Sequence, residues 1–373
     1  MRTAMKSFIS FIKKEAVLSA AAFLAVLSAF FVRPDAEYAG YIDYRVLALL
    51  FCLMLVVAAF KDIGMFSALG ARMLKHAHST RSLSMILVFL CFFSSMFITN
   101  DVALITFVPF AVMMLSLTGQ KKLMIPVITL QTIAANLGSM LTPVGNPQNL
   151  YLYSTYHIPI QRFLLLMLPL SAVSAIMLII AVLLLKNNSL DTDTAPKDAH
   201  ISGGFLAVIY ILLFLVCIAC VIHVIDYPIM LAIVVITMLV CNHRLFRNVD
   251  YYLLLTFVCF FIFIGNMERI PAVSDIMSRL ISGREVLLGI VFSQVISNVP
   301  ATILLSGFTS NYVPLLYGVN IGGLGTLIAS LASIISYRGY CASDGADKGR
   351  YILIFTVYNL IFLAVLSITC ILL

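Results

Sequence analysis

The sequence predicts an all-α polytopic membrane protein, and two observations lead to this class. The chain of 373 residues is 62% hydrophobic and only 10% charged, whereas soluble domains are about one-quarter charged. Apolar runs of roughly 17–23 residues recur along the chain, and each can cross about 30 Å of hydrocarbon as a helix. One of these runs is interrupted by polar residues, which marks a candidate binding site.

The basic charge of the chain indicates a membrane protein rather than a nucleic-acid-binding protein. The formal net charge is +7, but the Lys and Arg residues fall in short segments between the apolar runs. The first 15 residues carry four of them, ahead of an apolar run at 16–32 that no convincing small-residue cleavage site follows. We therefore interpret 16–32 as a retained first span and not as a signal peptide, and we expect a lipid bilayer, not nucleic acid, as the partner.

The remaining apolar runs divide the chain into spans, amphipathic segments and a linker. The stretch 61–78 mixes apolar and basic residues, which suits a helix along the membrane interface, and 266–285 is an amphipathic connector. The polar stretch 186–204 is interpreted as a cytoplasmic linker. Further spans are expected at 44–60, 163–185, 205–222, 227–241, 251–265 and 351–373.

The most informative segment is Thr99-Asn100-Asp101, in the middle of the apolar stretch 83–118. A charge near the bilayer centre costs about 3 kcal/mol or more, so such residues persist beside a water-filled cavity or a ligand. The apolar residues resume at once after the segment, without a Gly, Ser or Lys turn. We therefore expect a re-entrant hairpin at 82–118 with this segment at its tip. Two full spans joined by a loop in water are the alternative.

A broken helix is expected after this hairpin, at 123–157. Its stretch 138–149 contains two glycines and two prolines, and a proline interrupts a helix because it cannot donate the bond to residue i−4. Carbonyl groups freed inside a membrane need a cavity or a ligand. Neutral oxygens that suit a hard monovalent ion such as Na⁺ are supplied there by Ser139, Thr142, Asn146 and Asn149. The alternative is an ordinary loop that emerges on the outer side.

The second half of the chain carries a weaker copy of both features. Ser297-Asn298 takes the place of the first tip, in a second expected hairpin at 286–316. A glycine-rich segment from Gly322 to Thr326 then takes the place of the first break, in an expected broken helix at 319–336. Close helix packing through small residues is the alternative explanation of this second break.

The two matches occur in the same order and with the same flanks, which predicts two structural repeats, 1–185 and 205–373. If each hairpin enters and leaves on one side, an odd number of full spans separates them, so the repeats are inverted. Basic residues favour the cytoplasmic side. We therefore expect a cytoplasmic N-terminus, an external C-terminus, a first hairpin that opens inward and a second that opens outward. The expected outer segments hold only six of the 23 basic residues, namely Arg33, Arg45, Arg162, Arg269, Arg279 and Arg284.

Asp101 is the one ionisable residue at the two tips. Its charge would repel a bound anion, and hydrocarbon disfavours that charge, so Asp101 can carry a proton or pair with a cation. The alternative is a carboxylate that caps the half-helix beginning at Val102. The second tip has Val299 at the matching position.

At these residues the chain resembles the ion transporter superfamily, which includes divalent anion/sodium symporters, citrate transporters and the membrane subunit of arsenical pumps. The resemblance rests on the two tips, on Gly-Asn-Pro-Gln-Asn at 145–149 and on the hairpin–broken-helix order in both halves. It implies a scaffold domain, a mobile transport domain and a homodimer that works by an elevator motion. Dicarboxylate members resemble Ser-Asn-Thr at both tips. Asp101 and Val299 depart from that pattern, and Asn-Asp is more similar to arsenical-pump and metal–citrate relatives.

The tips and the breaks together form the predicted site. Substrate binding is expected from Thr99, Asn100, Asp101, Asn146, Ser297 and Asn298. The coupling ion, Na⁺ or H⁺, is expected at Asn100, Asp101, Ser139, Thr142, Gly145, Asn298, Gly322, Gly325 and Thr326. No cofactor besides the coupling ion is expected.

These features predict a secondary active transporter of a small inorganic or organic anion, coupled to Na⁺ or H⁺, in a bacterial inner membrane. The alternative is an efflux or antiport protein that exports arsenite-like oxyanions or exchanges Na⁺ for H⁺. The sequence shows no ATP-binding motif, so an ATPase would be a separate subunit. It also shows no convergent acid, base and nucleophile, so no enzyme activity is expected.

Overall fold

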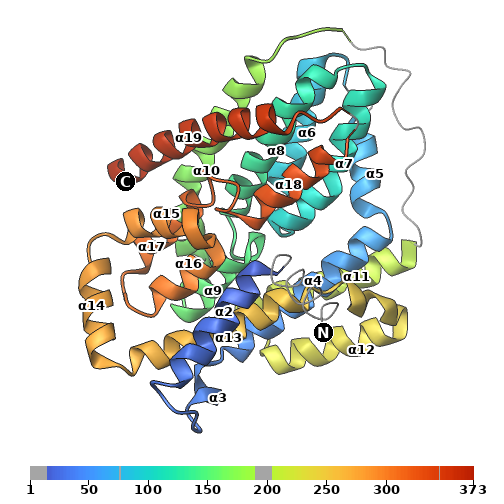
Figure 1. Cartoon of the computed structure of the whole chain (residues 1–373). Coiled ribbons are helices and arrows are strands. Elements are labelled where there is room, and N and C mark those ends of the chain that lie inside the picture. The colour runs from blue at the N-terminus through green and yellow to red at the C-terminus, as the bar shows by residue number, and fades with distance from the viewer. Residues whose placement is uncertain (1–14, 75–76, 190–203, 344) are drawn as a thin grey trace, which may run out of the picture.

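The computed structural model describes residues 15–74, 77–189, 204–343 and 345–373, and this part of the chain is almost entirely helical (Figure 1). Its one β feature is an isolated bridge between Ser79 and Ser189. Seven of its helices are long and apolar enough to cross a membrane. They are α4 (Tyr44–Asp62), α7 (Asn100–Leu117), α10 (Ile160–Leu183), α11 (Gly204–Val221), α12 (Tyr227–Asn242) with its 3₁₀ extension η4 (His243–Asn248), α13 (Tyr251–Glu268) and α19 (Lys348–Leu372). The all-α, multi-pass class is confirmed.

Shorter helices connect and interrupt these seven. The helices α5 and α14 lie within the two segments expected to be amphipathic, 61–78 and 266–285. Most of the expected linker 186–204 and the basic start of the chain lie outside the described residues. The shorter elements are α2 (Ala16–Ala29), α3 (Tyr38–Tyr41), α5 (Met65–Leu74), α6 (Thr80–Ser94), η1 (Lys121–Leu123), α8 (Met124–Ser139), η2 (Pro143–Gly145), α9 (Pro147–Thr155), α14 (Pro271–Ile281), α15 (Glu285–Ile296), α16 (Asn298–Ser306), α17 (Tyr312–Ile321) and α18 (Leu331–Cys341).

Several expected boundaries differ from the observed ones. The apolar run 16–32 is helical only to Ala29, so α2 has 14 residues. The expected second hairpin, 286–316, runs beyond α16, which ends at Ser306, and into the first turn of α17 at Tyr312. The connection at 307–311 contains Phe308 among polar residues. These residues are typical of a turn, so the sequence did contain a signal that the helix ends there, and the expected hairpin was drawn too long.

Several long helices begin where the sequence supplies an acidic cap. Asp43 accepts a hydrogen bond from the Val46 amide at the start of α4, at 2.9 Å. Asp250 caps α13 in the same way through Leu253, at 3.0 Å. Each bond satisfies one of the amides that a helix leaves free at its N-terminus.

Side-chain exposure follows the pattern of a protein in lipid. In α8, every residue from Met124 to Ser139 is buried except the one at position 126. Large apolar side chains are exposed on the peripheral helices, such as Leu165 in α10 and Leu353 in α19. Such a surface would cause aggregation in water, whereas hydrocarbon solvates it. The protein is therefore a multi-pass membrane protein.

The helices form two groups that meet at the middle of the molecule. In one group α2 packs against α13, and α11 and α12 pack against α4. In the other group α6 packs against α8, α7 against α18, and α15 against α17. Figure 1 shows the first group in the lower part of the view and α6, α7, α8, α18 and α19 in the upper part. The helices α9 and α16 connect the groups, because α9 contacts α4 and α16 contacts α13.

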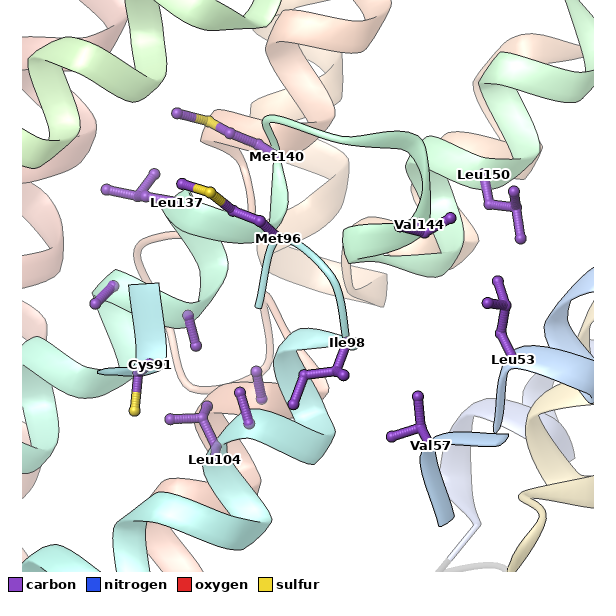
Figure 2. Close-up of a cluster of buried hydrophobic side chains, with 14 of the residues drawn as sticks. Leu53, Val57, Cys91, Met96, Ile98, Leu104, Leu137, Met140, Val144 and Leu150 are labelled. Atoms are coloured by element: carbon purple, nitrogen blue, oxygen red, sulfur yellow. The ribbon is translucent and has the colours of Figure 1, made fainter. Parts of the chain in front are cut away.

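Buried apolar side chains surround the link between α6 and α7 (Figure 2). Met96 and Ile98 of this link lie in one apolar cluster with Met140 and Val144, which lie between α8 and α9, and with Leu53 of α4. The polar residues of both segments are therefore set in hydrophobic surroundings, where a hydrogen bond missed inside the protein is not replaced by bulk water.

Candidate functional site

Both expected tips lie where one helix gives way to the next. Residues 95–99 are non-helical between α6 and α7, and Asn100 begins α7. In the second half a single residue, Ser297, separates α15 from α16, and Asn298 begins α16. Ser297 has a φ of +74°, a conformation that costs a non-glycine residue about 1–3 kcal/mol. Neither helix has a side-chain cap, so each places an asparagine at an uncapped N-terminus.

The first tip is bound to the second half of the chain through Asn136. The Asn100 Nδ2 donates to Asn136 Oδ1 at 2.9 Å, and the Ser330 hydroxyl donates to the same oxygen at 3.0 Å. Asn136 Nδ2 in turn donates to the carbonyl of Gly323 at 3.4 Å. Asn136 therefore joins the first tip to the break between α17 and α18.

The first break, between α8 and α9, is buried and held by two amide side chains. Asn146 caps α9 through the Asn149 amide at 2.8 Å, and its Nδ2 donates to the Ser139 hydroxyl at 3.1 Å. The Asn149 Nδ2 lies within 3.4 Å of three carbonyls at the end of α8 and in the break after it, those of Ser139, Met140 and Thr142. Carbonyls freed by the break are thus occupied by a neutral donor.

Asn320 of α17 connects the second break to the first. Its Nδ2 donates to Asn149 Oδ1 at 2.7 Å, and its Oδ1 accepts from Asn146 Nδ2 at 3.4 Å. All three asparagines are buried. The two breaks, which are far apart in sequence, therefore share one network of carboxamides.

Gln294 of α15 donates to backbone carbonyls of the second break, as Asn149 does to those of the first break. Its Nε2 donates to the carbonyls of Gly322 and Leu324, at 3.0 and 2.8 Å. Its Oε1 accepts from the Thr326 amide at 2.8 Å. Gly325 has a φ of +112°, which a glycine adopts without strain. The second break is therefore folded around one glutamine side chain.

The second tip also contacts the segment between α17 and α18. The Asn298 amide N–H donates to the Ala329 carbonyl at 2.9 Å. The Asn298 carboxamide lies against Gly323, where an added Cβ would be 2.9 Å from Nδ2. That Nδ2 donates no hydrogen bond within the described part of the chain. The second tip thus contacts Gly323 directly, whereas the first tip is connected to the Gly323 carbonyl through Asn136.

Two further contacts recur at matching positions in both halves. A Cβ on Gly138 would lie 2.6 Å from the Ser95 hydroxyl, and one on Gly322 would lie 2.7 Å from the Ser293 hydroxyl. Both serines precede their tip by four residues.

The second recurring contact involves the threonines that follow these glycines. The Thr142 hydroxyl donates to the Met96 carbonyl, and the Thr326 hydroxyl donates to the Gln294 carbonyl at 3.3 Å. Met96 and Gln294 both precede their tip by three residues. In each half the hairpin and the break are therefore connected in the same way.

The electrostatic character of this region is negative. Asp101 lies in the first turn of α7, is partly exposed, and its carboxylate repels that of Asp250. No Lys, Arg or His takes part in the hydrogen-bond network described above. A cavity of about 80 Å³ beside the second tip has no basic residue in its lining. It is lined by Glu15, Val17, Leu18, Asp250, Tyr252, Leu253, Thr256, Ser297, Val299, Pro300 and Leu331.

The structure brings together some of the residues expected at the site and leaves others at its margin. The network contains Asn100, Ser139, Asn146 and Asn298, and Gly145 packs on the Ser139 backbone. The side chains of Thr99 and Asp101 make no hydrogen bond within the described residues, so the capping expected as an alternative for Asp101 is not formed there. Thr326 is exposed.

Sequence reasoning left four members of the network out of the expected site. Asn136 and Asn320 could have been found, because they occupy matching positions just before the two breaks. Gln294 and Ser330 gave no such signal. The residues left out are Asn136, Gln294, Asn320 and Ser330.

A multi-span helical protein that buries an amide network at its helix breaks is a membrane transport protein. Residues 8–311 match the citrate transporter family, and the chain belongs to this family, within the ion transporter superfamily. The match includes both tips and the first break, whereas the second break lies beyond it.

Three relatives are similar to this chain over different lengths. An uncharacterized transporter of Methanocaldococcus jannaschii is 31% identical over 332 residues, which is 87% of this chain and 88% of that protein. Inner membrane protein YbiR of Escherichia coli is 30% identical over 318 residues, or 80% of each chain. A silicon efflux transporter of Oryza sativa is 33% identical over 139 residues, which is 37% of this chain and 28% of that protein.

Proposed function

We propose that the protein is a secondary active transporter of a small inorganic or organic anion, coupled to Na⁺ or H⁺ through alternating access of elevator type. The observation that carries this proposal is that both asparagine tips are connected to Gly323, the second directly through Asn298 and the first through Asn136. Discontinuous helices that point uncapped N-termini and freed carbonyls at one place are the usual form of a transporter site.

Two inverted repeats, 1–185 and 205–373, are part of the proposal. The recurrence of the Gly–Ser contact and of the Thr–carbonyl contact in both halves supports them. Helix packing supports them as well, because α2 packs against α13 of the other half and α12 against α4. An exchange of partners of this kind is expected when two halves are related by a pseudo-two-fold axis.

Helix lengths support re-entrant hairpins rather than full spans. The helices α15 and α16 have 12 and 9 residues, which at 1.5 Å per residue is about 18 and 14 Å. Neither crosses the roughly 30 Å hydrocarbon core. In the first half α7 is long enough to span the membrane, but α6 has only 15 residues. A hairpin that enters and leaves on one side suits both pairs.

The two helix groups suit a division into scaffold and transport domains. We assign the group of α2, α4, α11, α12 and α13 to the scaffold, and the group that contains both hairpins and both breaks to the moving domain. In this proposal the protein is a homodimer in a bacterial inner membrane, with a cytoplasmic N-terminus, a cytoplasmic linker at 186–204 and an external C-terminus. Reporter fusions at the C-terminus test the orientation.

Charge at the site explains why an anion would need a coupling cation. The network offers neutral amides and hydroxyls, and the nearest charges are the carboxylates of Asp101 and Asp250. An anion beside them is repelled unless a cation, or a proton on Asp101, offsets that charge. The proposed coupling-ion residues are those expected from the sequence, namely Asn100, Asp101, Ser139, Thr142, Gly145, Asn298, Gly322, Gly325 and Thr326.

Uptake by proteoliposomes tests this function. Labelled citrate, a dicarboxylate, sulfate and arsenite would be offered under an inward Na⁺ or H⁺ gradient. Loss of one hydrogen bond to a charged ligand costs about 1.5–3 kcal/mol, so Asn298→Ala should slow uptake by about 10- to 100-fold. Asn359→Ala in α19 is the matched control, because Asn359 is equally buried but outside the network. Uptake that Asn100→Ala and Asn298→Ala leave undiminished would contradict the proposal.

The second candidate is an efflux or antiport protein, and the acidic surroundings of Asp101 favour it. Two facing carboxylates suit the exchange of a cation for protons, or the export of a weak oxyacid that carries no charge. One relative is a silicon efflux transporter, which fits the second possibility. Resistance of cells to arsenite, sodium and lithium tests it, and Asp101→Asn should abolish any resistance gained. Anion uptake without resistance would reject it. An ATPase that drives export would be a separate subunit.

A further inference from the structure

A second buried polar region extends from the site along the contact between α8 and α18. Polar residues recur there at spacings of three or four, which places them on one face of each helix. The two faces meet, so the polar residues form one continuous line, which we call the hydroxyl seam. It consists of Thr129, Thr132 and Asn136 on α8 and of Ser330, Ser333 and Ser336 at the start of α18 and within it.

Two contacts hold the seam together across the two halves of the chain. The Ser330 hydroxyl donates to Asn136 Oδ1 at 3.0 Å, at the end near the first tip. One to two helical turns further, the Thr132 hydroxyl donates to Ser336 Oγ at 2.7 Å. All four residues are buried, so neither lipid nor bulk water reaches them.

Three hydroxyls, two in the seam and one beside it, have no hydrogen-bond partner among the described residues, although each is fully buried. They belong to Thr129, Ser333 and Tyr351. Other buried hydroxyls in this chain donate to the carbonyl four residues earlier. For Ser333 that carbonyl is Ala329, which already accepts from the Asn298 amide. A buried polar group without a partner costs about 1–3 kcal/mol, and ordered water is the usual solution.

The seam ends at the site on one side and near water on the other. At the site, Asn136 is bonded to Asn100, the neighbour of Asp101. At the far end, the Tyr351 hydroxyl lies beside Thr132 and Ser336, and its ring stacks on Tyr340 at 4.9 Å. The Tyr340 hydroxyl accepts a hydrogen bond from the Asp347 amide at 2.9 Å. Asp347 lies in the exposed loop between α18 and α19.

We propose that the hydroxyl seam holds a chain of ordered water molecules that carries a coupling proton between the α18–α19 loop and Asp101. This inference rests on the proposed function and assigns H⁺ as a coupling ion. A hydronium at the loop donates a proton to the first oxygen. Each following oxygen accepts one proton and passes another on, and the last water protonates the Asp101 carboxylate. The reverse sequence releases the proton, and no other bond changes.

Charged groups are placed in accordance with this route. The helix α8 has no charged residue, and the charged residues of α7 and α18 are Asp101 and the exposed Arg338. Asp250 is the other carboxylate near Asp101. The loop end of the seam carries Asp347 together with Lys348 and Arg350, which are exposed. A proton therefore meets no fixed cation along the seam itself.

Close packing of small residues is the competing explanation of the seam. It accounts for the serines, because small side chains let α8 and α18 approach. It does not account for Tyr351, since a phenylalanine would pack equally well there. The change Tyr351→Phe removes one oxygen and keeps the ring, so it separates the two explanations. Tyr210→Phe in α11 is a matched control, because the Tyr210 hydroxyl is equally buried and unpartnered but lies in the other helix group.

The test compares exchange with net uptake in proteoliposomes. Exchange of labelled citrate for unlabelled citrate at equal pH needs no net movement of protons, whereas uptake driven by a pH gradient does. We expect Tyr351→Phe and Ser333→Ala to keep exchange within about twofold of wild type and to lose at least about tenfold in pH-driven uptake. Tyr210→Phe should keep both activities. A high-resolution cryo-EM map should show water within hydrogen-bonding distance of Thr129, Ser333 and Tyr351.

Two results would overturn the inference. One is a resolved map in which the three hydroxyls have no water neighbour. The other is a pH-driven uptake that Tyr351→Phe and Tyr210→Phe leave at the same rate. Failure of the proposed function has a different signature, because wild-type protein would then exchange none of the offered solutes, while the map would still decide whether the seam is hydrated.

Discussion

The two tips differ in how their asparagines are used. The Asn100 carboxamide is bonded to Asn136 at 2.9 Å and through it to the second half of the chain. The Asn298 carboxamide donates no hydrogen bond in the described structure and lies against Gly323. The asparagine is common to both tips, but only one of the two amides is free to meet a ligand.

The difference indicates a division of roles between the tips. A first tip whose Asn100 is bonded to Asn136, which itself accepts from Ser330, is a rigid element that fixes the position of Asp101. A second tip, in which Ser297 alone turns the chain at φ +74°, has an Asn298 Nδ2 that donates no hydrogen bond within the described residues, and its Ser297 and Val299 line a cavity of about 80 Å³. We therefore infer that the first tip provides coupling and the second provides binding, and the following predictions test this comparison.

The largest expected effect comes from the glycines that join each hairpin to its break. A Cβ on Gly138 would lie 2.0 Å from the Phe92 carbonyl oxygen, whereas one on Gly322 would lie 2.7 Å from the Ser293 hydroxyl and 2.8 and 2.9 Å from the carbonyl oxygens of Gly318 and Gly289. Overpacking costs about 1–3 kcal/mol and sometimes more, and the shorter contact at Gly138 requires the larger shift of the backbone. We expect Gly138→Ala to abolish the monodisperse protein peak in size-exclusion chromatography, and Gly322→Ala to lower the thermal midpoint of a protein that still folds.

A control for both is Gly204→Ala at the start of α11, where an added Cβ meets no atom within 4 Å. It should leave the elution profile and the midpoint unchanged. Equal tolerance of Gly138→Ala and Gly322→Ala would show that the first half is no more tightly built than the second.

The next effect separates stability from binding at the two asparagines. Asn100→Ala leaves the Asn136 carbonyl with one donor fewer and should cost about 1–3 kcal/mol of stability. Asn298→Ala breaks no side-chain hydrogen bond of Nδ2 and should leave the thermal midpoint near that of wild type, while it slows uptake. Thermal shift without ligand, followed by uptake, measures both. The comparison fails if Asn298→Ala destabilises the protein as strongly as Asn100→Ala.

The fold class could be predicted because a membrane imposes a long and simple pattern. Apolar runs near 44–60 and 251–265 correspond to α4 and α13, and each begins at an Asp that caps its helix. The end of α16 at Ser306 was missed, although the polar connection 307–311, Gly-Phe-Thr-Ser-Asn, marks a turn there.

The site was only partly visible in the sequence, for a physical reason. Asn100 and Asn298 stand out because a polar group in an apolar run needs an explanation. Gln294 stands in a similar run, but its partners are carbonyls of Gly322 and Leu324, about 30 residues away in sequence. Backbone carbonyls carry no residue identity, so no sequence pattern points to them. Long-range side-chain-to-backbone bonds are therefore the part of the site that required coordinates.

A smaller effect is expected from relief of strain at the second tip. Ser297 has a φ of +74°, and its hydroxyl makes only long contacts, 3.4 Å to the Ala329 carbonyl and 3.5 Å to Asn298 Oδ1. Glycine adopts this conformation freely, so Ser297→Gly should leave stability unchanged or raise it by up to about 1 kcal/mol. Thr99→Gly at the first tip, where φ is −60°, should instead lower the thermal midpoint. A loss of stability in Ser297→Gly would show that the hydroxyl matters more than the strain.

The smallest effect is expected where the connection after α2 meets the end of α13. Arg269 donates to Asp35 at 2.8 Å and lies 3.3 Å from Glu37. At the corresponding end of α4, Asn242 donates to Asp62 at 3.0 Å. The first contact depends on an ion pair at the surface, and such pairs contribute little to global stability. Local motion is therefore the suitable measurement.

Protonation gives this last contact a pH dependence with a definite sign. The hydrogen bond from Arg269 holds the pKa of Asp35 below its usual range. The contact is therefore complete above the unfolded pKa of about 4 and is lost as the pH falls through the lower folded value. Arg269→Ala should speed hydrogen exchange in the 30–41 peptide at neutral pH, and wild-type protein should show the same change, corrected for the intrinsic rate, only in strong acid.

Asn242→Ala is the control at the α4 end, because it should loosen the start of η4 without any effect on the 30–41 peptide. The thermal midpoint should barely move in either variant. Exchange in the 30–41 peptide that Arg269→Ala leaves unchanged would mean that the aromatic contact of Tyr41 with Gly265, where an added Cβ would be 2.4 Å from the ring, holds this connection without the ion pair. The ends of α4 and α13 would then both be held without an ion pair, and the two halves would differ only at their tips.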